Sequence, residues 1–402
     1  MPMIPFYNPK ISIWDICQYL LSKDNVSDLN KIFCGYIGCS DVILTNSGKD
    51  ALKTCLLYYG ISTGDEVILP SFTCPSVAMA ILELNAVPVF ADIIENGFNI
   101  SLESVKEAIT KKTKAIIVAY MAGIPVDLDG FLKLSAEYGV VLIEDCAQAF
   151  GAKYKDKYLG LHGDAAIYSF GISKNIGGVG GGALVLNKKN DNGMDIKLME
   201  NRSNFKEYIL AILSTFVFRP CIYSAFLPIL KKQKKIDILN MINNPRENRI
   251  KAISNIAAYF AKRKLLEYET LKEKKNANAM IYRTYFSDVF GIIDIPHEAE
   301  PAYPYYPVLL NEKQVAEKLC KKLLFNNIEV KIKANVHFMA LWRYPFFREY
   351  QHYGENVLDI EDRYVLFPLM YSRRMTESIC NTTIKLEKII ENERNDKFIK
   401  NL

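Results

Sequence analysis

The chain has 402 residues and is 50% hydrophobic, which predicts a large buried core and excludes a disordered protein. Charged residues make up 24%, and the net charge of +5 is a mild bias spread along the chain, so we expect no nucleic-acid partner. Nine cysteines without a CxxC pair and four histidines without ligand spacing predict no structural metal and a reducing compartment.

The first part of the chain predicts two helical segments around a short strand. No basic segment followed by an apolar run opens the chain, so we expect no secretory signal and a cytoplasmic protein. Residues 11–33 have helical periodicity, and we expect them to pack against a sheet or a partner. One face of this segment carries Ile13, Ile16, Leu20 and Leu21.

Residues 42–60 predict a strand, a turn at Ser47-Gly48, and a helix from about Lys49 to Tyr59. Free amides at the start of this helix could bind a phosphate through hydrogen bonds and the helix dipole. An ordinary serine N-cap is the alternative interpretation. Residues 64–145 then alternate strand-like apolar runs with helical segments, a pattern that predicts an α/β fold with a mostly parallel sheet.

The stretch 140–186 holds two apolar strand-like runs, and Asp145 and Lys174 follow them. Because open α/β sheets place their chemistry where strands end, we expect both side chains in one site. A lysine amine could bind the aldehyde of pyridoxal phosphate, and a buried carboxylate would keep the pyridine nitrogen protonated. Ser169 adds a hydroxyl for a phosphate oxygen. The alternative is a strand-end ion pair beside a tight glycine turn.

The motifs EDCAQAFG, GDAAIYSFGISKN and GGG in this stretch resemble the DegT/DnrJ/EryC1/StrS family of sugar aminotransferases, which have fold type I. The resemblance extends over residues 42–182 and, more loosely, 249–390. It implies that Asp145 pairs with the pyridine nitrogen, Gln148 lies by the ring hydroxyl, Ser169 binds phosphate, and Lys174 forms the imine. Related dehydratases carry histidine at the lysine position, so Lys174 favours amino transfer.

Three positions depart from the family pattern. Lys49 stands where the family has a threonine, and its ammonium could replace the lost hydroxyl at the phosphate. Ser47 and Gly48 are the neighbouring residues that we expect to bind the cofactor. Cys74 occupies the place of an aromatic residue that covers the ring, so we expect Phe72 or Cys74 to do so. Tyr120 replaces a histidine and is a substrate candidate, with core packing as the alternative.

Residues 208–230 are abruptly apolar, and Lys231, Lys232, Lys234 and Lys235 follow them. We expect a cofactor domain over residues 1–204, and a bridging helix with a smaller C-terminal α+β domain over residues 245–402. We interpret residues 205–244 as an insertion between them. Arg219-Pro220 argues against a single membrane span. Two short helices dipping into one leaflet, with the lysines at anionic headgroups, are one interpretation. An apolar hairpin buried against the protein or a second copy is the other.

The C-terminal region contributes substrate candidates by resemblance, namely Arg249, His337, Arg373 and Arg374. Solvated surface cations are the alternative for each arginine. The resemblance further implies a homodimer that uses pyridoxal 5'-phosphate. Its expected reaction moves an amino group from an amino acid, with glutamate expected, to a nucleotide-linked keto sugar. The product would serve polysaccharide or glycoconjugate synthesis. A sugar dehydratase and a non-catalytic regulator of the same fold are the rival functions.

Overall fold

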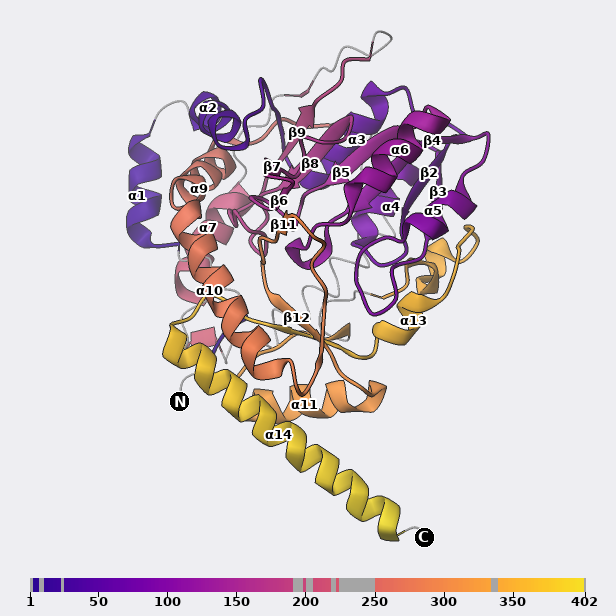
Figure 1. The fold of residues 1–402 in the computed structure, drawn as a ribbon. Helices are drawn as coiled ribbons and strands as arrows, with labels where there is room; N and C mark the ends of the chain where they lie inside the picture. Colours follow the sequence, from indigo (N-terminus) through magenta and orange to yellow (C-terminus); the bar gives the residue numbers. More distant parts are fainter. Residues whose placement is uncertain are drawn as a thin grey trace.

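A seven-stranded sheet forms the centre of the protein in the computed structural model (Figure 1). The structure describes residues 3–6, 11–22, 25–190, 198–199, 205–217, 222–223, 250–333 and 339–400. The strand order is β1-β9-β8-β5-β4-β2-β3, and β9 runs antiparallel to both of its neighbours. The strands are β1 (Ile43–Thr45), β2 (Glu66–Pro70), β3 (Val87–Ala91), β4 (Thr113–Ala119), β5 (Val141–Asp145), β8 (Ala165–Ser169) and β9 (Gly182–Leu186).

Helices cover both faces of this sheet because its strands alternate their apolar side chains between two cores. Ile116 and Val118 of β4 join the core under α2 (Asn25–Ile37), α5 (Leu102–Ala108), α6 (Leu128–Tyr138) and α9 (Asn255–Leu266). Ala115 and Ile117 face the opposite core, under α3 (Gly48–Tyr58) and α4 (Pro75–Leu82). Two short turns, η2 (Leu341–Arg343) and η3 (Pro345–Phe347), lie with this second core. The predicted α/β class with a mostly parallel sheet is confirmed.

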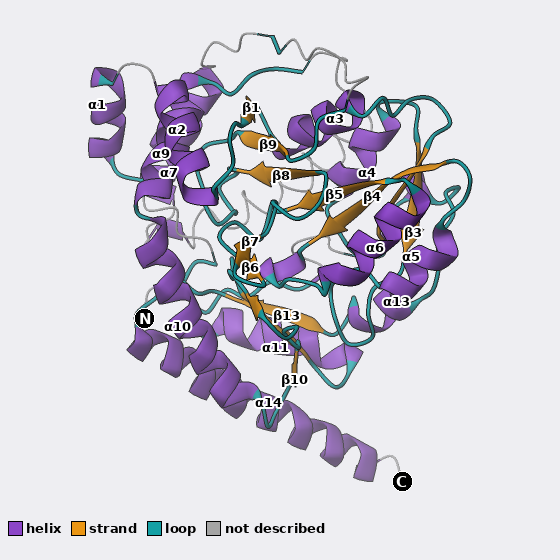
Figure 2. Ribbon diagram, turned by 45° about the horizontal axis from the view of Figure 1, so that its top comes forward, coloured by secondary structure: helices purple, strands orange, loops and turns teal. Residues whose placement is uncertain are grey.

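A smaller sheet lies below the central one, in the order β10-β12-β13, and all of its strands are antiparallel (Figure 2). Its strands are β10 (Gly291–Ile292), β12 (Tyr306–Leu309) and β13 (Tyr364–Phe367). The helices of this region are α10 (Tyr268–Phe286), α11 (Lys313–Phe325), α13 (Asn356–Ile360) and α14 (Arg373–Lys400). A third sheet joins β6 (Lys153–Tyr154) and β7 (Lys157–Tyr158) to β11 (Ala299–Glu300), so it links the two regions. The boundaries at residues 204 and 244 stay predictions.

The segment 11–33 differs from the expectation, because it holds the separate helix α1 (Ile13–Leu21) and the start of α2. Asp15 and Tyr19 form the buried side of α1, whereas Leu20 and Leu21 are exposed. The polar side turns inward because Asp15 closes a capping box with Ser12 and also pairs with Arg263.

Helix α7 (Phe205–Val217) lies beside α1, where the rings of Tyr19 and Tyr208 meet edge to face at 5.7 Å. Together with residues 222–223 it forms the described part of the predicted apolar insertion, while Arg219-Pro220 and the four lysines lie outside the described residues. Tyr223 is buried, and its hydroxyl donates to the Glu329 carboxylate at 2.7 Å. Among the helices that the structure describes, none is both long enough and apolar enough to cross a membrane.

Candidate active site

A cavity of about 720 Å³ opens where β4, β5 and β8 end and where α3 and α4 begin. This placement follows from the parallel arrangement of the three strands, which directs their carboxyl ends to one edge of the sheet. Nine of the residues predicted from the sequence line this cavity: Ser47, Gly48, Lys49, Cys74, Tyr120, Asp145, Gln148, Ser169 and Lys174.

Asp145 is the last residue of β5, and its carboxylate is buried in the floor of the cavity. Its Oδ1 accepts a hydrogen bond from the Ala147 amide at 3.0 Å. Burial raises the pKa of Asp145, and this effect exceeds the opposing effects of the Ala147 amide and the Lys174 ammonium. A buried carboxylate of this kind suits a cationic N–H group on a ligand, which would restore its charged form.

Lys174 follows β8 on a tight turn, in which its amide donates to the Gly171 carbonyl at 2.9 Å. Asn175 holds this turn in place. Its Nδ2 donates to the carbonyls of Gln148, Phe150 and Ala302 at 3.1, 3.3 and 2.8 Å. Asn175 was not among the residues predicted from the sequence, although its position directly after Lys174 was a usable signal.

The start of α3 and the end of β8 lie against each other and form a cradle in the wall of the cavity. Ser47 caps the helix, its Oγ accepting from the Asp50 amide at 3.1 Å. A Cβ at Gly48 would lie only 3.0 Å from Cβ of Ser169, so the absence of a side chain lets the helix approach the Ser169 hydroxyl. Gly182 of β9 is equally restricted, since a Cβ there would lie 2.5 Å from the Ser47 carbonyl carbon. The first-turn amides of an eleven-residue helix and two hydroxyls suit an anion here.

Lys49 lines the cradle, with its ammonium 2.6 Å from the Glu83 carboxylate at the end of α4. Lys53, one turn further along α3, contacts the same carboxylate at 3.1 Å. All three side chains are largely buried, so two ammonium groups share one carboxylate beside the cradle. The sequence analysis missed Glu83, which lies 34 residues from Lys49.

Gln148 is oriented by both regions of the protein. Its Oε1 accepts hydrogen bonds from the Ala122 amide, at 3.0 Å, and from the Tyr305 hydroxyl. Its Nε2 lies 3.5 Å from Met121 Sδ, a weak acceptor, and is therefore available as a donor to a ring hydroxyl. Tyr305 was missed because it is 157 residues from Gln148.

Tyr120 lines the cavity, but its hydroxyl donates to Glu144 at 2.7 Å. Burial raises the pKa of Tyr120 strongly, so it stays a neutral donor. Glu144 also accepts from the backbone amides of Gly160, His162 and Gly163. The hydroxyl of Tyr120 therefore belongs to this buried network.

The remaining predicted residues do not line the cavity or lie outside the described residues. Phe72 packs against the rings of Phe98 and Tyr364, at 5.4 and 5.6 Å, so Cys74 is the better placed of the two expected ring covers. Arg373 is exposed on α14 and pairs with Glu377, and Arg374 is also exposed. Arg249 and His337 lie outside the part of the chain that the structure describes.

The residues present fit pyridoxal phosphate. A lysine on a pinned turn, a buried carboxylate on the adjacent strand, and a hydroxyl-lined helix start match the aldehyde, the pyridine nitrogen and the phosphate of this cofactor. The fold and site therefore define a pyridoxal phosphate enzyme of fold type I.

Comparison with known proteins identifies the family. The profile of the DegT/DnrJ/EryC1/StrS aminotransferase family matches residues 16–207 and 249–379, so the chain belongs to this family.

Individual relatives agree with this assignment. The spore coat polysaccharide biosynthesis protein SpsC of Bacillus subtilis is 25% identical over 87% of this chain and 86% of its own. A UDP-N-acetyl-3-dehydro-α-D-glucosamine 3-aminotransferase of Acidithiobacillus ferrooxidans is 36% identical over 43% of this chain and 45% of its own. Spr1654 of Streptococcus pneumoniae, whose structure was solved in PLP and PMP forms, shares the fold. Its PMP form superposes with a TM-score of 0.76 at 18% identity, and the match covers 98% of this chain and 100% of Spr1654. The protein is a pyridoxal-phosphate-dependent aminotransferase.

Proposed function

We propose that this enzyme transfers an amino group from an amino acid, with glutamate as the expected donor, to the keto group of a nucleotide-linked sugar. The observation that carries the proposal is the placement of Lys174 and Asp145 on one cavity, at the ends of adjacent strands. The names of the relatives from A. ferrooxidans and B. subtilis support a sugar substrate and a role in polysaccharide or glycoconjugate synthesis.

When bound, pyridoxal phosphate supplies an aldehyde that captures amines and a ring that accepts electrons. Lys174 Nζ would bind the aldehyde and be displaced by the donor amine. As a free amine it would then move a proton from the donor carbon to the former aldehyde carbon, and in the second half-reaction from that carbon to the sugar carbon. Asp145 would hold the positive charge at the pyridine nitrogen. Gln148 Nε2 would donate to the ring hydroxyl.

The phosphate of the cofactor would be bound by Ser47, the amides of Gly48 and Lys49, and the hydroxyl of Ser169. Cys74 is the proposed neighbour of the ring. Tyr120 would border the substrate, while its hydroxyl keeps its hydrogen bond to Glu144. Roles for Arg249, His337 and Arg373 toward the substrate stay predictions.

The test follows both half-reactions. Mixing the holoenzyme with glutamate should convert the pyridoxal spectrum to the pyridoxamine spectrum, and a nucleotide-linked keto sugar should restore it with release of the amino sugar. Recovery of a deoxygenated sugar would instead identify the dehydratase. A protein that binds the cofactor but gives no spectral change with any amino donor would be the non-catalytic regulator.

We also propose that the region 208–235 contacts a membrane peripherally. The exposed side chains of α7 and α1 support this proposal, because eight large apolar residues gather on these two adjoining helices: Ile13, Trp14, Leu20, Leu21, Ile209, Ile212, Leu213 and Phe216. The sequence continues from α7 to the four lysines at 231–235, which suit anionic headgroups.

Liposome flotation tests this contact. The wild type should float with anionic vesicles at low salt, whereas a variant with residues 208–235 replaced by a short polar linker should not. A wild type that stays wholly in the soluble fraction would contradict the membrane contact and favour a buried hairpin or a contact with a second copy.

A further inference from the structure

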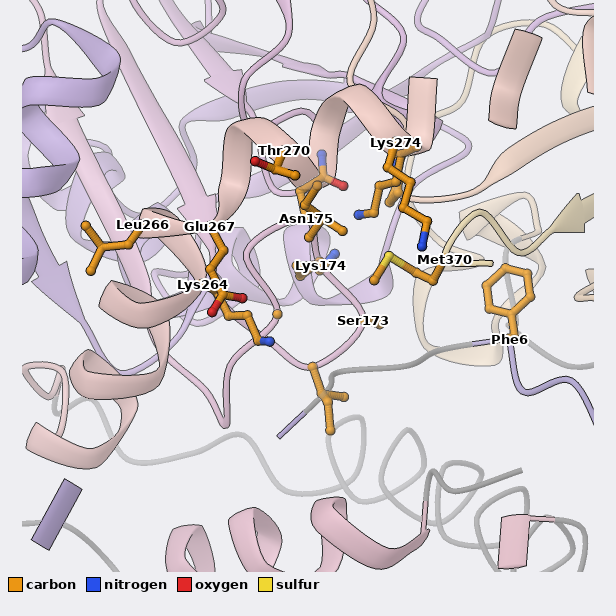
Figure 3. Close-up of a pocket in the computed structure, with 15 residues that line it drawn as sticks. Phe6, Ser173, Lys174, Asn175, Lys264, Leu266, Glu267, Thr270, Lys274 and Met370 are labelled. Carbon is orange, nitrogen blue, oxygen red and sulfur yellow. The ribbon is translucent and has the colours of Figure 1, made fainter. Parts of the chain in front are cut away.

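A second cavity, of about 440 Å³, lies between the 172–177 turn, α9 and α10, with Phe6, Pro304 and Met370 on its remaining side (Figure 3). It shares Lys174 with the candidate active site and none of that site's other lining residues. The turn that carries Lys174 therefore borders both cavities. In the view of Figure 3 the side chains of Lys264 and Lys274 lie on opposite sides of Lys174.

The charged groups around this cavity are mostly positive. Four lysines line it: Lys174, Lys264, Lys274 and Lys275. Among the described lining residues one carboxylate is present, that of Glu267, and it lies 3.8 Å from the Arg263 guanidinium. Lys264 and Lys275 are only 9% and 5% exposed, although they come from different helices. The described wall of the cavity therefore carries more amines than carboxylates, and Lys264 and Lys275 are the buried amines.

The amine of Lys275 gives the clearest indication that the cavity binds an anion. It makes no hydrogen bond or ion pair with any residue that the structure describes. Burial, reinforced by the nearby Lys264 ammonium, lowers its pKa to about 8. Because buried charges in proteins are normally paired, an ammonium held here is expected to have a counter-ion.

Asn175 forms part of the wall of this cavity and fixes the turn that carries Lys174. Its Nδ2 donates to three backbone carbonyls, which fixes the orientation of the amide. Its Oδ1 is buried and has no partner among the described residues. Because this oxygen has almost no solvent-accessible surface, it does not face the open space of the cavity. The groups that the cavity offers to a ligand are therefore the lysine amines that line it.

We propose that this cavity binds an anionic group of the phosphate or carboxylate class, with Lys275 as its principal ligand and Lys264 and Lys274 beside it. Since Lys174 borders the cavity, the anion would belong to a molecule that reaches the reacting centre. This last step rests on the proposed function, which offers two sources: the diphosphate of a nucleotide-linked sugar and the carboxylate of the amino donor.

Calorimetric titration of the holoenzyme tests the site, because the cofactor then occupies the active-site phosphate cradle. Pyrophosphate and succinate represent the two sources, and sodium chloride at equal ionic strength is the reference. We expect one of the two anions to bind, and Lys275→Met to weaken that binding by about tenfold or more, the effect of one charge-assisted hydrogen bond. Lys272→Met is the matched control, since Lys272 lies one turn away on α10 and pairs with Glu269 outside the cavity.

The pH dependence provides a second readout. The titratable groups that face Lys275 are Lys264 from α9, Lys274 from α10, Lys174 from the turn and Glu267 between the two helices; the other lining side chains do not titrate. Lys275 is charged below about pH 8, so anion affinity should fall as the pH rises through 8 in the wild type and not in Lys275→Met. Melting temperatures of both variants report whether they fold.

Three outcomes would overturn the proposal: neither anion binds more tightly than chloride, both lysine variants bind equally well, or only Lys272→Met loses binding. Because binding is measured without turnover, a Lys275-dependent anion site in a protein that fails to transaminate would contradict the proposed function and leave the site standing.

Discussion

We propose that the chemistry depends on the charge of Asp145, because the cofactor ring accepts electrons well only when its nitrogen is protonated. Asp145→Asn keeps the shape of the side chain and removes its charge. We expect kcat to fall by roughly 10²–10³, in the range seen when a single electrostatic group is lost from an active site, with a smaller change in cofactor affinity. Steady-state kinetics and cofactor titration measure both effects.

Asp164→Asn is a suitable control for this variant. Asp164 is buried near the opposite end of the same strands, where it accepts from the Leu142 amide and pairs with Lys188. Its loss should lower the stability and leave the cofactor spectrum unchanged. Wild-type turnover in Asp145→Asn would mean that another acid serves the ring nitrogen.

Lys275 should make the stability of the protein depend on pH in an unusual direction. Its pKa is about 8 in the folded protein and 10.5 as its ordinary value, so the unfolded chain binds more protons between these limits. The free energy of unfolding contributed by this residue should therefore rise as the pH increases from 8 to 10.5. Denaturant unfolding of the wild type and Lys275→Met across this range checks the effect: the variant should lack the rise, and an equal rise in both proteins would contradict it.

At the start of α3, we propose that Lys49 replaces the family's threonine. The Lys49 ammonium is fixed by Glu83 at the edge of the cradle, so we expect it to contact the cofactor phosphate. Lys49→Met should weaken pyridoxal phosphate binding by about tenfold, as expected for one charge-assisted hydrogen bond, and leave pyridoxal binding unchanged. Fluorescence titration with both compounds isolates the phosphate. Equal losses for the two compounds would assign Lys49 to the fold instead.

The elements around the site were predictable because their signals are local. The apolar run before Asp145 and the run before Lys174 indicate strands, and a parallel sheet brings their ends together whatever the loops between them do. Tyr305 and Glu83 carry no such signal. Their contacts with Gln148 and Lys49 arise when distant parts of the chain pack together. The apolar face expected for the segment 11–33 was wrong for a related reason. Asp15 is buried because it pairs with Arg263, 248 positions away.

At the scale of the whole molecule, we propose a homodimer with both active sites at its interface, an inference from fold type I. Dilution should lower the specific activity in parallel with dissociation, because each site would then lose what the second copy contributes. Light scattering and activity assays over the same concentrations test this. A monomer with full activity would refute it.

We propose that Lys174 carries the cofactor, and borohydride reduction of the purified yellow holoenzyme followed by peptide mapping tests this assignment. Reduction makes the bond between lysine and cofactor permanent, so the modified peptide identifies the lysine. We predict a single adduct on Lys174, and its absence from Lys174→Ala together with loss of turnover. An adduct on Lys49, or on Lys275 in the neighbouring cavity, would contradict the account.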